Sequence, residues 1–210
     1  VSLGRLRRIA RSTGAEVTDR YRHERMPFAG LDAADSAETL ASRLEAATGE
    51  AHAYRIFRIH RDVRFSKDKR PYNAHLHISF SPEGGCKEGG PAWMVGLDPD
   101  GLTLGAGIFA FSAPRLDSWR ALVAAPEGAS VAELIDRLRS EEVRVGEPEL
   151  KRVPAPYPAD HPRADLLRRK GLTAWIDGLV SETAFATAGP SNCALALLRL
   201  RELFQVLRGL

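Results

Sequence analysis

Two stretches of alternating residues constrain the fold of this chain more than any other feature. From Phe57 to Phe65 every second residue is apolar apart from Arg61, and the pattern resumes from Ala74 to Phe80 after the connection 66–72. Side chains alternate between the two faces of a β-strand, so each stretch predicts a strand with one buried and one exposed face. If the strands pair as an antiparallel hairpin, their apolar residues share the core side.

The same pairing gathers polar side chains on the opposite face of the hairpin. These side chains are Arg58, His60, Asp62, Arg64, His75, His77 and Ser79. Residues 55–70 hold seven basic and two acidic residues, a local charge of +5, whereas the whole chain has a formal net charge of only +3. This asymmetry predicts a field that attracts anions over one region, whereas a nucleic-acid coat would need basic residues over a broader surface.

The rest of the chain supplies a second hairpin and several helices. Residues 93–97 and 102–110 alternate on either side of a turn signal at 98–101. Apolar residues recur at helical spacing over 35–49, 115–123, 130–138, 160–171 and 191–207. The predicted fold class is therefore α+β. We expect a mainly antiparallel sheet of at least four strands, in two hairpins, packed by helices from the N-terminal, middle and C-terminal segments.

Two glycines stand out in the second hairpin. The polar face of its return strand carries Thr103, Gly105 and Gly107, so two of three positions lack a side chain. Bare positions in a strand let another backbone or a ligand approach closely. Crowding by a packed helix is the alternative explanation.

No repeat, low-complexity tract or linker divides the sequence, so we expect one α+β domain over 1–210 with an N-terminal helical segment over 1–30. Cys86 and Cys193 form no disulfide or zinc-site pattern, which fits a reducing cytoplasm. No apolar run approaches the roughly 20 residues that cross a bilayer. We therefore expect a cytoplasmic protein with no membrane partner, and the oligomeric state stays open.

One long motif resembles a known family. The string Arg61-Asp62-x-Arg64-Phe65-Ser66-Lys67-Asp68-Lys69-x-Pro71-Tyr72 is similar to the signature of the conserved hypothetical proteins called the domain of unknown function 2461 family. Three further segments fit the same resemblance: Gly105-x-Gly107 with Pro114 and Trp119-Arg120, Lys151-Arg152-x-Pro154, and Tyr157-Pro158-x-Asp160-His161-Pro162. The resemblance spans roughly residues 20–207 and implies little about activity, because the family has no established one.

The chain departs from the family pattern at two places. Family members usually carry a Trp-Phe and an Asn-Arg pair shortly before a Tyr that matches Tyr21, where this chain has 13–18 without those side chains. Members also often have Lys-Thr after the Pro-Tyr, where this chain has Asn73-Ala74. A family site that used the missing groups would be altered or lost here, and the N-terminal segment 1–30 is in this sense divergent.

The basic residues around the predicted inter-strand connection form a candidate anion site. Ammonium and guanidinium groups together suit a phosphate or a carboxylate, through point charge and bidentate hydrogen bonds. The predicted ligand-binding residues are Arg58, Arg64, Lys67, Lys69 and Tyr72. Alternatively, Asp62 and Asp68 tie these bases into a structural network of ion pairs.

Three histidines are candidates for chemistry. His75 could act as a general acid or base if a carboxylate such as Asp62 orients it, and His161, at the start of a predicted helix, is a second candidate. The simpler interpretation of 160–162 is a helix cap followed by a first-turn proline. His75 and His77 also have a spacing compatible with metal ligation, but two histidines on a polar sheet face are more often solvated, so we predict no metal site.

We therefore expect a small anionic ligand bearing phosphate or carboxylate on the polar sheet face. A catalytic version of the site would be a hydrolase or transferase that needs no cofactor. The alternatives are a noncatalytic module that binds nucleic acid or protein, and a structural ion network with the functional site elsewhere, for example in the glycine-rich loop 83–90. The phosphate-loop, serine-hydrolase, zinc-protease and dinucleotide signatures are all missing from the sequence.

Overall fold

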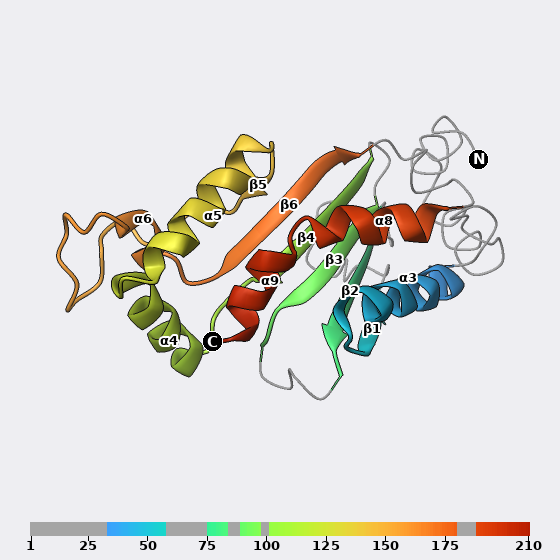
Figure 1. Ribbon diagram of the computed structural model, residues 1–210, viewed down its shortest axis with the longest axis horizontal. Coiled ribbons are helices and arrows are strands. Elements are labelled where there is room, and N and C mark those ends of the chain that lie inside the picture. The colour runs from blue at the N-terminus through green and yellow to red at the C-terminus, as the bar shows by residue number, and fades with distance from the viewer. Residues whose placement is uncertain (1–32, 58–74, 84–88, 98–100, 180–187) are drawn as a thin grey trace, which may run out of the picture.

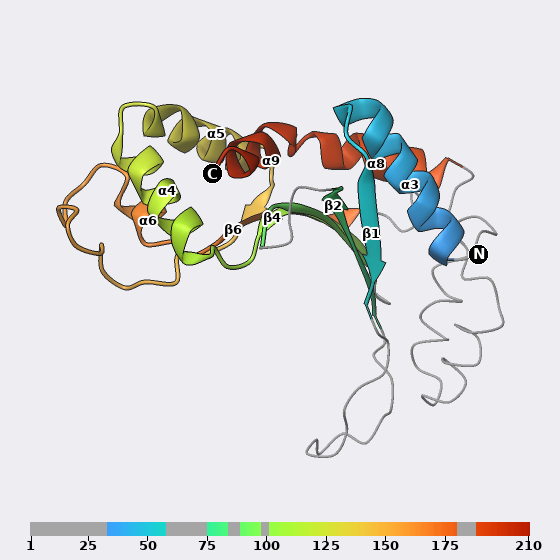
Figure 2. The same cartoon turned by 90° about the horizontal axis from the view of Figure 1, so that it is seen from below.

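The chain folds into a six-stranded antiparallel sheet with helices packed against one of its faces (Figures 1 and 2). The computed structural model describes residues 33–57, 75–83, 89–97, 101–179 and 188–210. The strand order is β1-β2-β3-β4-β6-β5, and all neighbours run antiparallel. The strands are β1 (His52–Ile56), β2 (Leu76–Pro82), β3 (Ala92–Leu97), β4 (Leu102–Ile108), β5 (Arg144–Val145) and β6 (Leu172–Leu179).

The helices come from three parts of the chain, as expected. They are α3 (Ala33–Thr48), α4 (Ala113–Ala124), α5 (Gly128–Ser140), α6 (Ala164–Leu167), α8 (Gly189–Leu198) and α9 (Arg201–Arg208). Helices α3, α8 and α9 cover the sheet from β1 to β4, whereas α4 and α6 lie beyond its β6 end (Figure 1). The predicted α+β class, with its antiparallel sheet and its helices from all three segments, is confirmed.

The first predicted hairpin is correct in its second strand and wrong at Phe57. The strand that pairs with β2 begins at His52, and its even-numbered residues share the helix side, with Tyr54 opposite Phe80 and Ile56 opposite Ile78. Phe57 therefore points to the other side, where its side chain is 43% exposed. Its backbone continues the ladder by donating to the carbonyl of His77 at 2.9 Å. The remainder of that predicted strand, 58–65, lies outside the described residues.

The sequence interpretation overlooked β6, which lies between β4 and β5. Its arrival explains the two glycines of β4, because neither position has room for a side chain. A Cβ atom on Gly105 would lie 2.4 Å from the Trp175 ring, and one on Gly107 would lie 2.1 Å from the carbonyl oxygen of Leu172. Another backbone does approach closely, as one of the two interpretations held, and it belongs to the neighbouring strand.

Three helix boundaries also differ from the predictions. The helix α5 begins at Gly128, two residues before the predicted start at 130, and its cap makes no side-chain hydrogen bond. The helix expected over 160–171 is reduced to the four residues of α6. The last predicted helix is divided into α8 and α9, with Leu200 at the N-cap of α9.

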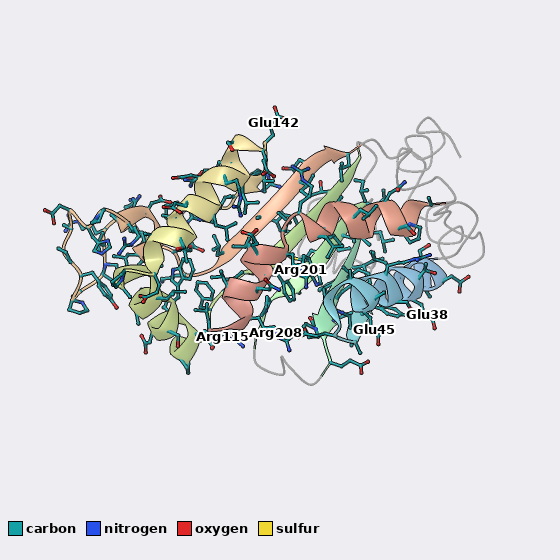
Figure 3. All side chains as sticks on the ribbon, viewed as in Figure 1. Glu38, Glu45, Arg115, Glu142, Arg201 and Arg208 are labelled. Atoms are coloured by element: carbon teal, nitrogen blue, oxygen red, sulfur yellow. The ribbon has the colours of Figure 1, made fainter. Side chains whose placement is uncertain are left out.

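The core lies between the sheet and the helical layer. The fully buried rings of Trp93 and Phe204 stack there with centroids 4.2 Å apart, which joins β3 to α9. The outer surface of the helices is charged, and Figure 3 shows Glu38 and Glu45 on α3 and Arg201 and Arg208 on α9. The helical layer thus has an apolar inner side and a charged outer side, as an amphipathic layer requires.

A buried histidine sits at the edge of this core. The indole nitrogen of Trp93 donates to Nε2 of His52 at 3.2 Å, which requires that nitrogen to be unprotonated. Burial lowers the pKa of His52 below its usual 6.5, although Glu50 and Glu45 oppose the effect. The neutral imidazole is therefore part of the folded core.

A buried guanidinium organises the other end of the molecule. The Arg169 side chain is 1% exposed and donates to Asp165 at 2.9 Å and to the carbonyl of Gly146. Burial tends to raise the pKa of Asp165, but hydrogen bonding from Arg169 and the charges of Arg169, Arg139 and Arg168 outweigh it and lower that pKa. One carboxylate therefore contacts three arginines, and the guanidinium of Arg169 is buried against it rather than exposed on a basic surface.

Acid should destabilise the protein through His52. The unfolded chain takes up a proton at this residue below about pH 6.5 and the folded chain resists it, so the stabilising contribution is complete above that pH and is lost as the pH falls. We expect the free energy of unfolding in urea to decrease from pH 7.5 to 5.5, and to decrease less in His52→Gln. The control His75→Gln removes an exposed histidine outside the core and should keep the wild-type slope. An unchanged slope in His52→Gln would contradict this account.

Removing the Asp165 carboxylate should leave Arg169 buried without a counter-charge. We expect Asp165→Ala to lower the free energy of unfolding by about 3 kcal/mol, near the lower end for breaking a buried pair because Asp165 itself is 41% exposed. Asp136→Ala is the matched control, since Asp136 also pairs with Arg139 but is 76% exposed, and it should cost less than about 1 kcal/mol. Equal losses in the two variants would show that Arg169 does not depend on Asp165.

Candidate functional site

The face of the sheet opposite α3, α8 and α9 is covered by none of the described helices (Figure 2). We call it the open face. Strand alternation and register place its side chains in two rows that cross the strands. The first row runs Phe57, His77, Gly96, Thr103, and the second runs Arg55, Ser79, Met94, Gly105, Trp175, Arg144.

A cavity of about 670 Å³ is hollowed into the open face. Its volume falls within the range of about 300–1,000 Å³ typical of small-molecule sites. Side chains from all six described strands or their ends line it: Phe57, His77, Ser79, Met94, Thr103, Phe109, Arg144 and Trp175. The lining is therefore mixed, with aromatic and thioether groups beside imidazole, hydroxyl and guanidinium groups.

Glycines in the two central strands determine the shape of the open face around the cavity. Gly96 of β3 and Gly105 of β4 place no side chain on the floor, and neighbouring rings lean over both positions. The His77 ring lies 3.5 Å from the position of a Cβ on Gly96, and the Trp175 ring occupies the space above Gly105. The two rings thus reach inward from β2 and β6 toward the middle of the sheet.

The indole of Trp175 is held on several sides. Its Nε1 donates to the hydroxyl of Thr173 at 3.0 Å, so its one polar atom is satisfied within its own strand. The Phe109 ring lies 5.9 Å away at a tilt of 46°, and the Arg144 guanidinium lies 5.6 Å from the indole centroid. Trp175 nevertheless stays partly exposed and lines the cavity, so its position is fixed before any ligand arrives.

An ion pair closes the β6 side of the cavity. Arg144 donates to both carboxylate oxygens of Asp177, at 2.6 Å from Nε and 2.9 Å from Nη2, and the Thr103 hydroxyl donates to the same carboxylate at 3.3 Å. The hydrogen bond from Arg144 lowers the pKa of Asp177 and exceeds the opposing effect of burial. This pair is neutral overall, so Arg144 does not present a full uncompensated charge to the cavity.

The β1–β2 side of the cavity carries the imidazoles and the guanidinium of Arg55, which forms no ion pair within the described part of the chain. The His75 and His77 rings stack with centroids 4.6 Å apart, but only His77 lines the cavity. Arg55 lies over the Phe57 ring at 5.1 Å from its centroid and makes no ion pair with any other described residue. Positive charge on this side therefore comes from Arg55.

The predicted ligand-binding residues Arg58, Arg64, Lys67, Lys69 and Tyr72 lie outside the described residues, as do His60 and Asp62. His161 lies in the connection that precedes α6, and α6 lies at the end of the molecule remote from β1 and β2 (Figure 1). Its Nδ1 accepts a hydrogen bond from the backbone of Arg163 at 3.0 Å, a local turn contact. Within the part of the chain that the structure describes, no group of three potential metal ligands comes together.

Sequence reasoning missed five side chains of this site: Met94, Phe109, Arg144, Trp175 and Asp177. A usable signal was present in 172–177, where Leu172, Ala174 and Ile176 alternate with Thr173, Trp175 and Asp177. That pattern predicts a strand with an indole and a carboxylate on its polar face. The pairing of Asp177 with Arg144 depends on strand order and could not be inferred from spacing.

Comparison with protein families decides the relationship of this chain. The family described as conserved hypothetical protein (DUF2461) matches residues 15–205, nearly the whole sequence. The chain belongs to this family. All the side chains that line the cavity fall within the matched region. No curated protein matches the sequence, and no described helix is long and apolar enough to cross a membrane.

The exposure of Trp175 is directly measurable. The sequence has three tryptophans, and Trp93 and Trp119 are both 0% exposed. Acrylamide should therefore quench mainly the emission of Trp175 in the folded protein, and Trp175→Phe should remove most of the quenchable fraction. Urea-unfolded protein is the control, since all tryptophans then become accessible. Undiminished quenching in folded Trp175→Phe would mean that another tryptophan meets solvent.

Proposed function

We propose that this protein binds a small organic anion in the cavity of the open face. The observation that carries the proposal is the hollow itself: a sheet face that no described helix covers, with glycines at its centre and aromatic rings at both sides. The face of a sheet that contacts only water normally carries polar side chains. Here Phe57 is 43% and Phe109 70% exposed, so apolar surface remains for a ligand to cover.

The energetic reason for binding is the removal of this apolar surface from water. Each Å² of apolar surface that a ligand covers contributes roughly 25 cal/mol. The rigid strands that present Met94 and Trp175 lose little conformational freedom on binding, because Met94 is 6% exposed and Trp175 is held by Thr173. The cavity is thus suited to an organic molecule rather than to a bare inorganic ion.

The preference for an anion rests on the β1–β2 side. Arg55 has no acidic partner among the described residues, and His77 and Ser79 add hydrogen-bonding groups beside it. The basic segment predicted to receive an anion leaves the described chain after Phe57 and rejoins it at His75, both on this side of the open face. Arg58, Arg64, Lys67, Lys69 and Tyr72 remain part of the proposal on that basis.

A catalytic role would extend the same proposal. In a cofactor-independent hydrolase or transferase at this site, His77 would be the proton-transfer group, because it is the imidazole that lines the cavity. His75 would act through its stacking contact with His77. His161 is the less favoured candidate, since its side chain serves the turn before α6.

The test is to fill the cavity and ask whether anion binding disappears. A Cβ on Gly96 meets only ordinary van der Waals contacts, so Gly96→Val should fold and project its methyl groups into the hollow. Gly101→Ala is the matched control, because its Cβ is equally tolerated and Gly101 does not line the cavity. Ser79→Phe offers a second way to fill the site from β2.

Melting temperatures would be measured with a panel of carboxylates and phosphates and their neutral amide or alcohol counterparts. We expect at least one anion to raise the melting temperature of the wild type and of Gly101→Ala, and to lose its effect in Gly96→Val and Ser79→Phe. Circular dichroism checks that the variants are folded. The proposal fails if no anion shifts the wild type, or if the shift persists in both filled variants.

A further inference from the structure

We infer that the anion bound on the open face is a compact aromatic acid whose planar ring stacks on Trp175. The inference rests on the proposed function and names the class of molecule that the site selects. It starts from the way the indole is mounted. Gly105 below the ring, Thr173 at its nitrogen and Phe109 beside it hold the ring in one position while it remains part of the cavity wall.

A fixed and partly exposed indole favours flat partners. Aromatic rings prefer offset-stacked or tilted arrangements with centroids about 4.5–7 Å apart. Such pairs contribute a stabilising free energy in addition to that of the area they bury. A saturated ring of the same size covers the surface but lacks this gain. Because Gly105 supports the indole from the floor, the ring cannot sink away when a ligand presses on it. The site therefore distinguishes planar rings from puckered ones.

The spacing of the two glycines limits where the acid group can be attached. Gly96 faces Thr103 and Gly105 faces Met94, so Gly96 and Gly105 are diagonal neighbours on adjacent strands, roughly 7–8 Å apart. His77 leans over the first and Trp175 over the second. A carboxylate joined to the ring directly, or through one or two atoms, covers this span together with a hydrogen bond of about 2.8 Å. A longer chain between ring and acid would carry the charge past His77.

The polar groups agree with this orientation. At the Trp175 end, Arg144 is already paired with Asp177, so an added negative charge there would meet a carboxylate as well as a guanidinium. At the other end, Arg55 has no described acidic partner and lies in the row of Ser79. The ring therefore belongs at Trp175 and the charge at the β1–β2 side.

Matched ligands separate the two properties. Benzoate, indole-3-carboxylate and 2-naphthoate are planar acids, cyclohexanecarboxylate is a puckered acid of similar size, and benzamide is planar and neutral. Dissociation constants would be measured by calorimetry and by quenching of Trp175 emission in the full-length protein. We expect at least one planar acid to bind about tenfold more tightly than cyclohexanecarboxylate and than benzamide. This ratio of dissociation constants corresponds to the upper end of the free energy of one aromatic stacking contact.

Variants assign the preference to the indole. Trp175→Phe keeps an aromatic ring and should retain the preference for planar acids, whereas Trp175→Leu should reduce the ratio between planar and puckered acids to near one. Gly105→Ala would force the indole off the floor and should weaken planar acids selectively. Folding of each variant is checked by its melting temperature without ligand.

The outcomes distinguish the stacking of a planar ring on Trp175 from the anion site itself. If cyclohexanecarboxylate binds as tightly as the planar acids, or if Trp175→Leu keeps the preference, the stacking inference is overturned and the anion site stands. If benzamide equals benzoate, the ring is recognised and the proposed anion site is overturned. If neither planar nor puckered acids bind, both proposals fail.

Discussion

The close approach of β6 to β4 is the contact on which the rest of this molecule depends. Glycines allow it from both strands: a Cβ on Gly107 would collide with the Leu172 carbonyl, and one on Gly171 would lie 2.1 Å from the Phe109 carbonyl oxygen. Gly107 also adopts a φ of 145°, which side chains rarely permit. This junction brings residues more than sixty positions apart into register and places Trp175 over the floor of the open face. Without it there would be no β6 wall and no cavity.

The sequence was informative where a pattern is local. Alternation identified β2, β3 and β4, and it would have identified β6 had the same test been applied to 172–177. At Phe57 the alternation misled, because two consecutive residues, Ile56 and Phe57, are both apolar and only the pairing with β2 decides which faces the helices. The face of the sheet on which a residue lies cannot be decided from its own strand alone, because it depends on the register with the neighbouring strand.

Other features could not be predicted from the order of residues along the chain. The pairing of Arg144 with Asp177 and the burial of Arg169 beside Asp165 depend on which elements become neighbours. The fold places Arg169 among the least exposed residues, although a charged side chain is normally expected at the surface. Most of the basic segment 55–70 lies outside the described residues, whereas the described site combines aromatic, thioether and polar groups. The charge pattern of the sequence predicted only a polar part of the site, and the structure adds its apolar part.

Apart from Phe57 and Phe109, the side chains that line the cavity sit within strands rather than in connections. Hairpin connections could therefore lengthen or shorten among relatives while the cavity kept its shape. A slip of one residue in the pairing of β4 with β6 would do the opposite, turning Trp175 toward the helices and Ala174 or Ile176 toward the cavity. The strand register thus determines which side chains line the cavity. Gly107 and Gly171, which fix this register, therefore preserve the site as well as the fold.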